Sequence, residues 1–291
     1  MYLHTVWRVL CGGMPHTAIL FPGQGSQTDD MRVMVERFRP ELLQAAVQVV
    51  GEDPFARIGD GTRFAQPAIF CASLAGWEAL GRPEGDFMAG HSLGELAALV
   101  AASSLREHDA LELVALRGRL MQEAGERAGD GGMLALMGRG AAERAPELAR
   151  ARGLTVANDN APQQVVLSGP RTALPDAAAA ASELGLRPME LEVTGAFHSP
   201  MMASAAPAFD GALERVEVSP PTVTVVSAVT AQPFDDVRLR LLEALTRPVR
   251  WRETMLALQS LGAERFIEVG PGRVLSGLAK RTLADVELVH A

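Results

Sequence analysis

The chain has 291 residues, of which 48% are hydrophobic and 21% charged, a composition that excludes intrinsic disorder, collagen and coiled coils. Its 35 acidic and 27 basic side chains give a net charge of −8, which argues against a nucleic-acid partner bound through overall positive charge. The length is enough for one large domain or two.

Cysteine content and hydropathy indicate the compartment. Cys11 and Cys71 provide neither a disulfide framework nor the ligand spacing of a metal site, so we expect a reducing, cytoplasmic location. No apolar run reaches the roughly 18–20 residues of a membrane span, so we expect no membrane partner. Residues 1–13 have Arg8 within a short apolar stretch and no small-residue cleavage site, which does not fit a signal peptide. We interpret 1–13 as an extension outside the fold.

In the first half of the chain, apolar residues predict strands alternating with helices. The run HTAILF at 16–21 is typical of a short buried strand, and a glycine-rich loop at 22–27 closes it. The elements predicted next are a helix over 29–50, a buried helix over 66–80 that starts near Pro67, a short strand at 86–89, and helices over 95–102 and 107–124.

The second half contains an insert followed by more α/β elements. Strands and helices are predicted in the order strand–helix–strand–strand–helix–strand, at 133–137, 141–152, 155–158, 164–168, 171–184 and 187–193. This order is typical of a ferredoxin-like α+β small subdomain, which we place at 129–194. Residues 14–128 and 195–291 then form a large α/β subdomain, hydrolase-like, with a parallel sheet and a nucleophile elbow. Its later elements are a helix at 201–216, a strand at 222–227, a helix near 238–245, a strand at 265–269 and a helix at 273–282.

The turn at 90–94, Gly-His-Ser-Leu-Gly, matches the pattern G-x-S-x-G between a predicted strand and an Ala-rich helix. Such a turn lifts the oxygen of Ser92 out of the chain at a helix N-terminus, where the amide of Leu93 can stabilise an oxyanion. The pattern also occurs in ordinary loops, and Ser92 could simply cap the helix. The flanking strand and helix favour the nucleophile.

A serine nucleophile needs a base. His198 stands where the predicted insert returns to the larger unit, a junction at which clefts form. A single loop histidine is nevertheless more often a surface residue. The other histidines fit the role less well, because they are terminal, open a strand or helix, or lie beside Ser92: His4, His290, His16, His108 and His91.

Arg117 lies in a predicted helix among Leu113, Leu116 and Leu120. Its stem could cover apolar surface while its head stays in water, which is the commoner arrangement. Alternatively, a buried guanidinium could hold a substrate carboxylate by two hydrogen bonds. The spacing does not decide between them. The loop at 22–27 lacks both G-x-G-x-x-G and the lysine of a P-loop, so it gives little support for a nucleotide site.

Seven motifs then occur in order along the chain: FPGQGSQ at 21–27, GHSLGE at 90–95, LRGRLMQEA at 116–124, NDNAP at 158–162, GAFHS at 195–199, RPVRW at 247–251 and EVGPGRVLSGL at 268–278. Together they resemble the malonyl-CoA:acyl-carrier-protein acyltransferase family over about 17–283. The wording of GAFHS is similar to that of free-standing, trans-acting acyltransferases of polyketide synthases. The ferredoxin-like insert also matches the small subdomain of that family.

The resemblance implies transfer of a malonyl group from malonyl-CoA to the phosphopantetheine thiol of an acyl carrier protein, for polyketide or fatty-acid synthesis. Ser92 would be the acylated nucleophile in a ping-pong reaction and His198 its base. The amides of Gln24 and Leu93 would form the oxyanion hole, and Arg117 would bind the malonyl carboxylate. No metal or redox cofactor would be bound. Phe197 resembles malonyl-selective members, since methylmalonyl-selective ones have a smaller serine there.

One position departs from the fatty-acid members, which have a glutamine that helps orient the histidine where this chain has Arg250. A guanidinium cannot accept a hydrogen bond from an imidazole N–H. We therefore expect a backbone carbonyl near Arg250 to orient His198, with Asn160 as a further candidate.

Three alternatives remain: a thioester hydrolase, a carrier-to-carrier acyltransferase on the same fold, and a catalytically silent binding subunit. The resemblance also implies an acidic carrier protein, and residues 238–281 hold nine basic but only four acidic side chains. We expect a monomer whose carrier-docking patch includes cations from this segment: Arg247, Arg250, Arg252, Arg273, Lys280 and Arg281.

Overall fold

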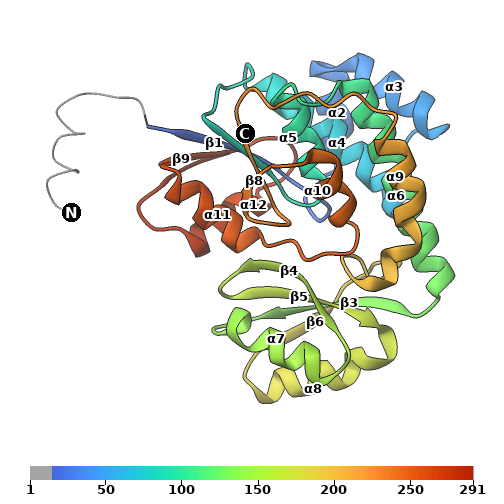
Figure 1. Cartoon of the computed structure of the whole chain (residues 1–291), viewed down its shortest axis with the longest axis vertical. Helices are drawn as coiled ribbons and strands as arrows, with labels where there is room; N and C mark the ends of the chain where they lie inside the picture. The colour runs from blue at the N-terminus through green and yellow to red at the C-terminus, as the bar shows by residue number, and fades with distance from the viewer. Residues whose placement is uncertain (1–14, 291) are drawn as a thin grey trace, which may run out of the picture.

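The computed structural model describes residues 15–290 and contains two sheets, one beneath the other in Figure 1. The predicted extension at 1–13 lies outside the described residues. The larger sheet has the order β10-β9-β1-β2-β7-β8, and all neighbours are parallel except the edge pair β7 and β8. Its strands are β1 (Thr17–Phe21), β2 (Phe87–Gly90), β7 (Thr224–Ser227), β8 (Gln232–Pro233), β9 (Arg265–Glu268) and β10 (Glu287–His290).

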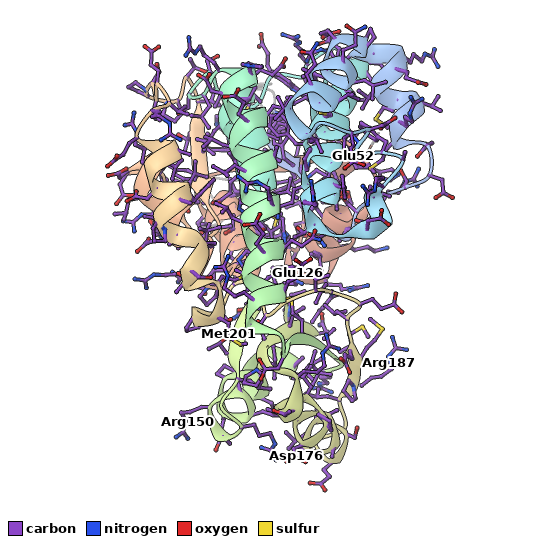
Figure 2. All side chains as sticks on the ribbon, turned by 90° about the vertical axis from the view of Figure 1, so that its right-hand side faces the viewer. Glu52, Glu126, Arg150, Asp176, Arg187 and Met201 are labelled. Atoms are coloured by element: carbon purple, nitrogen blue, oxygen red, sulfur yellow. The ribbon has the colours of Figure 1, made fainter. Side chains whose placement is uncertain are left out.

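Helices cover this sheet because its central strands are buried on both faces; all five residues of β1 are buried. The most buried helix, α4, packs along α6, whose far end reaches the smaller unit near Glu126 (Figure 2). The helices are α2 (Met31–Phe38), α3 (Pro40–Val50), α4 (Thr62–Ala79), α5 (Gly94–Ala101), α6 (Glu107–Ala128), α9 (Ala206–Leu213), α10 (Val237–Glu243), α11 (Trp251–Ser260) and α12 (Val274–Thr282).

The smaller sheet is antiparallel, with the order β4-β5-β3-β6, and α7 and α8 cover one face. Along β3, Leu134 and Leu136 point toward these helices, whereas Met133, Ala135 and Met137 face the larger unit. The elements are β3 (Gly131–Met137), α7 (Ala141–Ala151), β4 (Thr155–Ala161), β5 (Gln164–Pro170), α8 (Leu174–Glu183) and β6 (Arg187–Glu190). This arrangement is ferredoxin-like, and the predicted fold class is confirmed.

Local predictions differ from the structure at proline residues. The helix predicted over 29–50 is two helices, because Pro40 starts a new one as its first residue. The helix predicted to begin near Pro67 begins at Thr62, so the proline lies inside its second turn.

Strands β8 and β10 were not predicted, since two and four residues at a sheet edge carry little periodicity.

The two units are joined by backbone hydrogen bonds as well as by the chain crossovers. Val249, just before α11, donates to the carbonyl of Ala157 and accepts from the amide of Asp159, at 2.8 and 2.9 Å. Arg252 then holds the carboxylate of Asp159 with contacts of 2.7–3.1 Å. The segment before α11 therefore fixes the smaller sheet against the larger unit. Between residues 15 and 290, no helix combines the length and the apolar character needed to cross a membrane.

Candidate active site

The turn between β2 and α5 presents Ser92 in a left-handed conformation, with φ of 54°. The glycines on each side are required by close backbone approach. A Cβ on Gly90 would lie 2.0 Å from the carbonyl carbon of Gly94, and one on Gly94 would lie 2.2 Å from the oxygen of Phe21. The motif therefore folds as the nucleophile elbow that the sequence predicts.

His198 meets this serine from the segment that follows the smaller sheet. Its Nε2 lies 2.9 Å from Oγ of Ser92, and its Nδ1 lies 2.8 Å from the carbonyl oxygen of Ala244. Because a carbonyl only accepts hydrogen bonds, Nδ1 carries the proton, which leaves Nε2 free to accept the proton of Ser92. The backbone of His198 is also left-handed, with φ of 56°, a strained conformation typical of reacting groups.

The orientation of His198 departs from the sequence prediction. A backbone carbonyl does orient the ring, but it is that of Ala244 at the end of α10, so the prediction of a carbonyl near Arg250 is wrong. The guanidinium of Arg250 instead contacts Glu253 and the carbonyl of Thr230. Asn160 Oδ1 accepts a hydrogen bond from Nε2 of His91, at 2.8 Å, and is not bonded to His198. Chain separation explains the error, because no local pattern identifies Ala244 as a neighbour of His198.

Burial sets the protonation of the pair. Desolvation, together with the nearby Arg117 and His91, lowers the pKa of His198 to about 3. A lowered pKa means that the ring loses its proton at a lower pH, so His198 is neutral and able to accept a proton throughout the physiological range.

We therefore expect the reactivity of Ser92 toward a fluorophosphonate probe to change by less than about threefold between pH 5 and pH 8. A histidine of ordinary pKa would lose about 30-fold of its base form over that interval. The measurement is the rate of labelling, followed by intact-protein mass. Burial raises the pKa of Glu95 to about 7, within the same interval, so the Glu95→Gln variant is measured in parallel. A fall centred near pH 6.5 in both proteins would contradict the assignment to a buried neutral His198.

Arg117 is buried, with 2% of its surface exposed, so the commoner surface arrangement does not hold. Its Nη2 lies 3.1 Å from Oγ of Ser92 and its Nη1 donates to Gln66 Oε1 at 2.8 Å. Burial lowers the pKa of Arg117 to about 10, which still leaves it charged at neutral pH. Within residues 15–290 no carboxylate lies in ion-pair distance of it. A buried cation that has only neutral hydrogen-bond partners is destabilised, and a bound anion would stabilise it.

A chain of side-chain amides and hydroxyls holds Arg117 in place. Gln66 donates to the hydroxyl of Thr62, and that hydroxyl donates to Gln24 Oε1, each at 2.9 Å. These hydrogen bonds link the guanidinium of Arg117 to the loop that follows β1. Sequence reasoning missed Gln66, because a glutamine within an apolar helix gives no sign that it faces an arginine on another helix.

The amides of Gln24 and Leu93 both belong to residues that line the cavity beside Ser92. Between residues 15 and 290, neither backbone N–H donates to a protein acceptor. Two free donors beside the nucleophile could bind an oxyanion.

The cavity lies between the two units and has a volume of about 400 Å³. Ser92, Arg117 and His198 reach it from the larger unit, and Phe197, 6% exposed, forms part of the wall. The smaller sheet supplies a largely apolar wall with four flexible methionines nearby: Met121, Met133, Met137 and Met189. A mostly apolar cavity with a few polar groups and adaptable methionines is typical of a small-molecule site.

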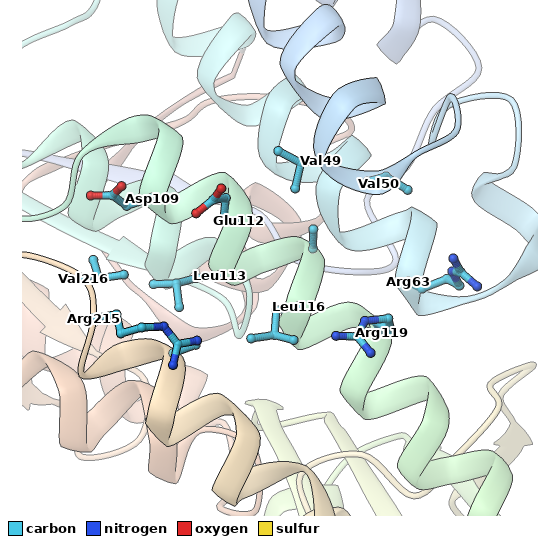
Figure 3. Close-up of a pocket in the computed structure, with 12 residues that line it drawn as sticks. Val49, Val50, Arg63, Asp109, Glu112, Leu113, Leu116, Arg119, Arg215 and Val216 are labelled. Atoms are coloured by element: carbon cyan, nitrogen blue, oxygen red, sulfur yellow. The ribbon is translucent and has the colours of Figure 1, made fainter.

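A second cavity of about 400 Å³ lies on a different face of α6, between Val49, Arg63, Leu116 and Arg215 (Figure 3). Among the described residues that line it there is no serine, cysteine or histidine. Ser92 and His198 are therefore not part of this second cavity.

The predicted docking cations are placed unequally. Three form ion pairs with neighbouring acids: Arg247 with Glu243, Arg250 with Glu253, and Arg252 with Asp159. Arg281 donates to Gln164 at 2.9 Å. Arg273 and Lys280 are exposed, and their side chains have no hydrogen bond or ion pair within the described chain. Both lie on or beside α12, which lines the cavity through Val274, Leu275 and Leu278.

Residues 19–290 match a family model described as the acyl transferase domain. The chain belongs to this acyl transferase family. Its fold is similar to that of the malonyl-CoA:acyl carrier protein transacylase of Xanthomonas oryzae, with a TM-score of 0.87 and 35% identity over 95% of this chain and 94% of that one.

Two further relatives of this acyl transferase come from polyketide systems. The polyketide biosynthesis protein ThaF of Burkholderia thailandensis is 38% identical over 93% of this chain, which spans only 24% of that protein. A malonyl-transacylase solved in complex with a type II polyketide synthase acyl-carrier protein has a TM-score of 0.84 and 34% identity, covering 95% of this chain and 96% of that one. The family resemblance and the acyltransferase class predicted from sequence are confirmed.

Proposed function

We propose that this acyl transferase moves a malonyl group from malonyl-CoA to the phosphopantetheine thiol of an acyl carrier protein. One observation carries the proposal: the buried guanidinium of Arg117 points at the oxygen of Ser92 and has no carboxylate partner of its own within residues 15–290. An acyl group held on Ser92 that ends in a free carboxylate would supply that partner. The names of the relatives agree, since they include a malonyl-CoA:acyl carrier protein transacylase.

In the first half-reaction, Oγ of Ser92 attacks the thioester carbonyl carbon while its proton passes to Nε2 of His198. The negative charge that develops on the carbonyl oxygen is bound by the amides of Gln24 and Leu93. The carbon–sulfur bond then breaks, and the proton on His198 goes to the leaving thiolate of coenzyme A. The product is a malonyl ester of Ser92 whose carboxylate lies on Arg117.

The second half-reaction reverses these roles. The pantetheine thiol of the carrier gives its proton to His198 and attacks the ester carbonyl, and Ser92 leaves with the proton returned to its oxygen. Every proton and bond in both steps is provided by the two substrates, Ser92 and His198. We therefore infer that no metal or redox cofactor takes part. The free thiol of Cys71 supports a cytoplasmic location.

Intact-protein mass after mixing with malonyl-CoA, acetyl-CoA and methylmalonyl-CoA tests the proposal. We expect a malonyl adduct that persists until a holo carrier protein is added and then moves to the carrier. Release of free malonate without a carrier would favour the hydrolase. Failure of malonyl-CoA to label, with labelling from an acyl-carrier donor, would favour carrier-to-carrier transfer.

The wall formed by Phe197 provides a test of acyl selectivity. We expect Phe197→Ser to raise the kcat/KM for methylmalonyl-CoA relative to malonyl-CoA by about 10-fold or more, because the smaller side chain leaves room for an α-methyl group. The same change at Phe234, which is outside the cavity lining, serves as the control. An unchanged ratio in Phe197→Ser would remove this residue from acyl selection.

We also propose that Arg273 and Lys280 form the part of the docking patch that is free to meet an acidic carrier. We expect the double variant Arg273→Glu, Lys280→Glu to raise the KM for the carrier by about fivefold or more and to leave acylation by malonyl-CoA unchanged. Arg37→Glu, on α2 away from the cavity lining, is the control. An unchanged carrier KM would place docking elsewhere.

The biosynthetic pathway that this acyl transferase serves is inferred from its relatives and from one motif. We infer a role in polyketide or fatty-acid synthesis, with the polyketide role supported by the similarity to ThaF and by the motif around His198. Two carrier proteins, one from a polyketide pathway and one from fatty-acid synthesis, would decide between these roles. The measurement is the kcat/KM for malonyl transfer to each carrier.

A further inference from the structure

The proposed mechanism leaves one buried acid without a role. Glu95 is 1% exposed, stands three residues after Ser92 in the first turn of α5, and is absent from the cavity lining. Burying a carboxyl group is costly unless hydrogen bonds compensate. Here, Glu95 Oε1 accepts from the amide of Ala228 at 2.8 Å and from the hydroxyl of Ser227 at 3.2 Å.

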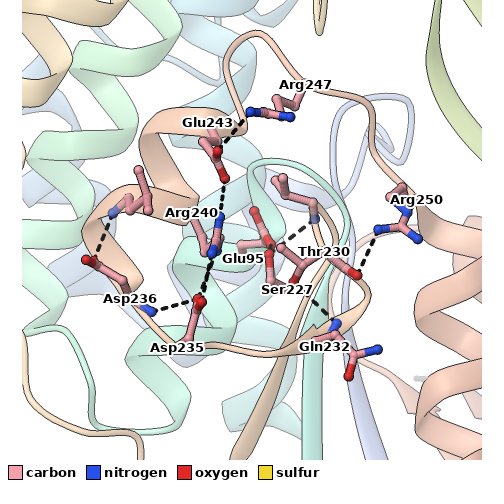
Figure 4. Close-up of polar contacts among 12 residues, drawn as sticks. Glu95, Ser227, Thr230, Gln232, Asp235, Asp236, Arg240, Glu243, Arg247 and Arg250 are labelled. Carbon is pink, nitrogen blue, oxygen red and sulfur yellow. Dashed lines mark hydrogen bonds and ion pairs between the residues drawn. The ribbon is translucent and has the colours of Figure 1, made fainter.

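These two partners are the last residue of β7 and the first residue of the turn that follows it. A second segment holds the same turn from the other side. The carbonyl of Ala228 accepts the amide N–H of Arg250 at 2.7 Å. The guanidinium of Arg250 donates to the carbonyl of Thr230 at 2.9 Å. Figure 4 shows Glu95 and Arg250 on opposite sides of this turn. Ala228 is therefore hydrogen-bonded through its N–H to Glu95 on α5 and through its C=O to the segment before α11.

That segment also carries the carbonyl that orients His198. Ala244 caps α10, six residues before Arg250. The helix is anchored by Arg240, whose guanidinium contacts Asp235 at 2.7 and 2.8 Å and Glu243 at 2.5 Å. A closed ring results. It runs from Ser92 along the chain to Glu95, across to Ala228 and Arg250, back along the chain to Ala244, and through His198 to Ser92.

We propose that Glu95 is a positioning residue that closes this ring and so fixes His198 Nε2 within hydrogen-bond distance of Ser92 Oγ. The inference rests on the proposed roles of Ser92 and His198. Its physical basis is that the serine and its base come from chain segments 106 residues apart, so their separation depends on the contacts between those segments. A displacement of about 1 Å between two reacting groups costs on the order of 10²-fold in rate.

The test compares Glu95→Ala with Glu95→Gln, since an amide oxygen can still accept from Ala228 whereas a methyl group cannot. For Glu95→Ala we expect a 10- to 100-fold lower kcat for acylation with KM for malonyl-CoA changed by less than about threefold, and an equal fall in fluorophosphonate labelling of Ser92. For Glu95→Gln we expect both rates within about threefold of wild type. The matched controls, Glu183→Ala and Glu183→Gln on the exposed face of α8, should leave both unchanged.

A third variant, Arg250→Ala, tests the other side of the turn and remains informative if Glu95→Ala does not fold. It should lower kcat without raising KM, and its effect should be less than additive with that of Glu95→Ala. Wild-type labelling rates in Glu95→Ala, or equal losses in Glu95→Ala and Glu95→Gln, would overturn the proposal. Normal phosphonate labelling of wild type without malonyl transfer would overturn the proposed function but leave the ring intact. Absence of labelling in wild type would overturn both.

Discussion

Replacing Ser92 with alanine should abolish the acyl-enzyme and reduce malonyl transfer by about 10⁴-fold or more. The reason is that Ser92 is the only hydroxyl in contact with both Nε2 of His198 and the guanidinium of Arg117 within the described chain. Without it, His198 has no nucleophile to deprotonate and no covalent intermediate can form. The substitution removes a single oxygen, so the cavity and the fold should remain.

Intact-protein mass after incubation with malonyl-CoA provides the measurement, and transfer to a holo carrier provides the rate. Ser182→Ala on α8 is the matched control, because the same oxygen is removed from an exposed helix position far along the smaller unit. Labelling of Ser92→Ala at another residue with retained transfer would contradict the assignment. A stable fold, checked by thermal denaturation, separates loss of chemistry from loss of structure.

Local sequence patterns predicted the parts of this molecule that depend on local geometry. The turn around Ser92 could be identified because two glycines, a strand and a helix are required together within a few residues. The ferredoxin-like unit could be identified because its six elements are consecutive. Elements defined by tertiary contact were less accessible: the edge strand β10 exists because it pairs with β9, and its own four residues have no distinctive period.

The site was predictable in the residues that occur in motifs and less so in the contacts between them. Nothing in the spacing of Arg117 showed that it is buried, because its burial depends on the packing of α4 against α6. Its partner Gln66 lies on α4, 51 residues away in the chain. The acceptor for His198 is a main-chain carbonyl, and a backbone atom has no residue-type signal. Glu95 is part of the motif GHSLGE, but its contact could not be predicted, because its partner Ala228 lies 133 residues further along the chain.

Replacing Arg117 with alanine should remove the preference for malonyl over acetyl groups. We expect kcat/KM for malonyl-CoA to fall by about 10²–10³-fold, because loss of a buried, hydrogen-bonded charge partner leaves the substrate carboxylate without a partner in a desolvated site. Acetyl-CoA has no such carboxylate, so its kcat/KM should change little. Acylation rates for both thioesters, measured by rapid quench and intact-protein mass, give the ratio.

Two further variants separate charge from geometry. Arg119→Ala removes the same side chain from the exposed side of α6, where it pairs with Glu123, and should leave the ratio unchanged. Arg117→Lys keeps the charge but loses the planar fork that can bind Gln66 and a carboxylate together, so only part of the malonyl preference should remain. If Arg117→Ala kept the full preference, the carboxylate would have to be recognised by another group, and the observation that carries the proposed function would no longer support it. The prediction therefore tests whether a buried cation without a resident anion is the feature that selects the substrate.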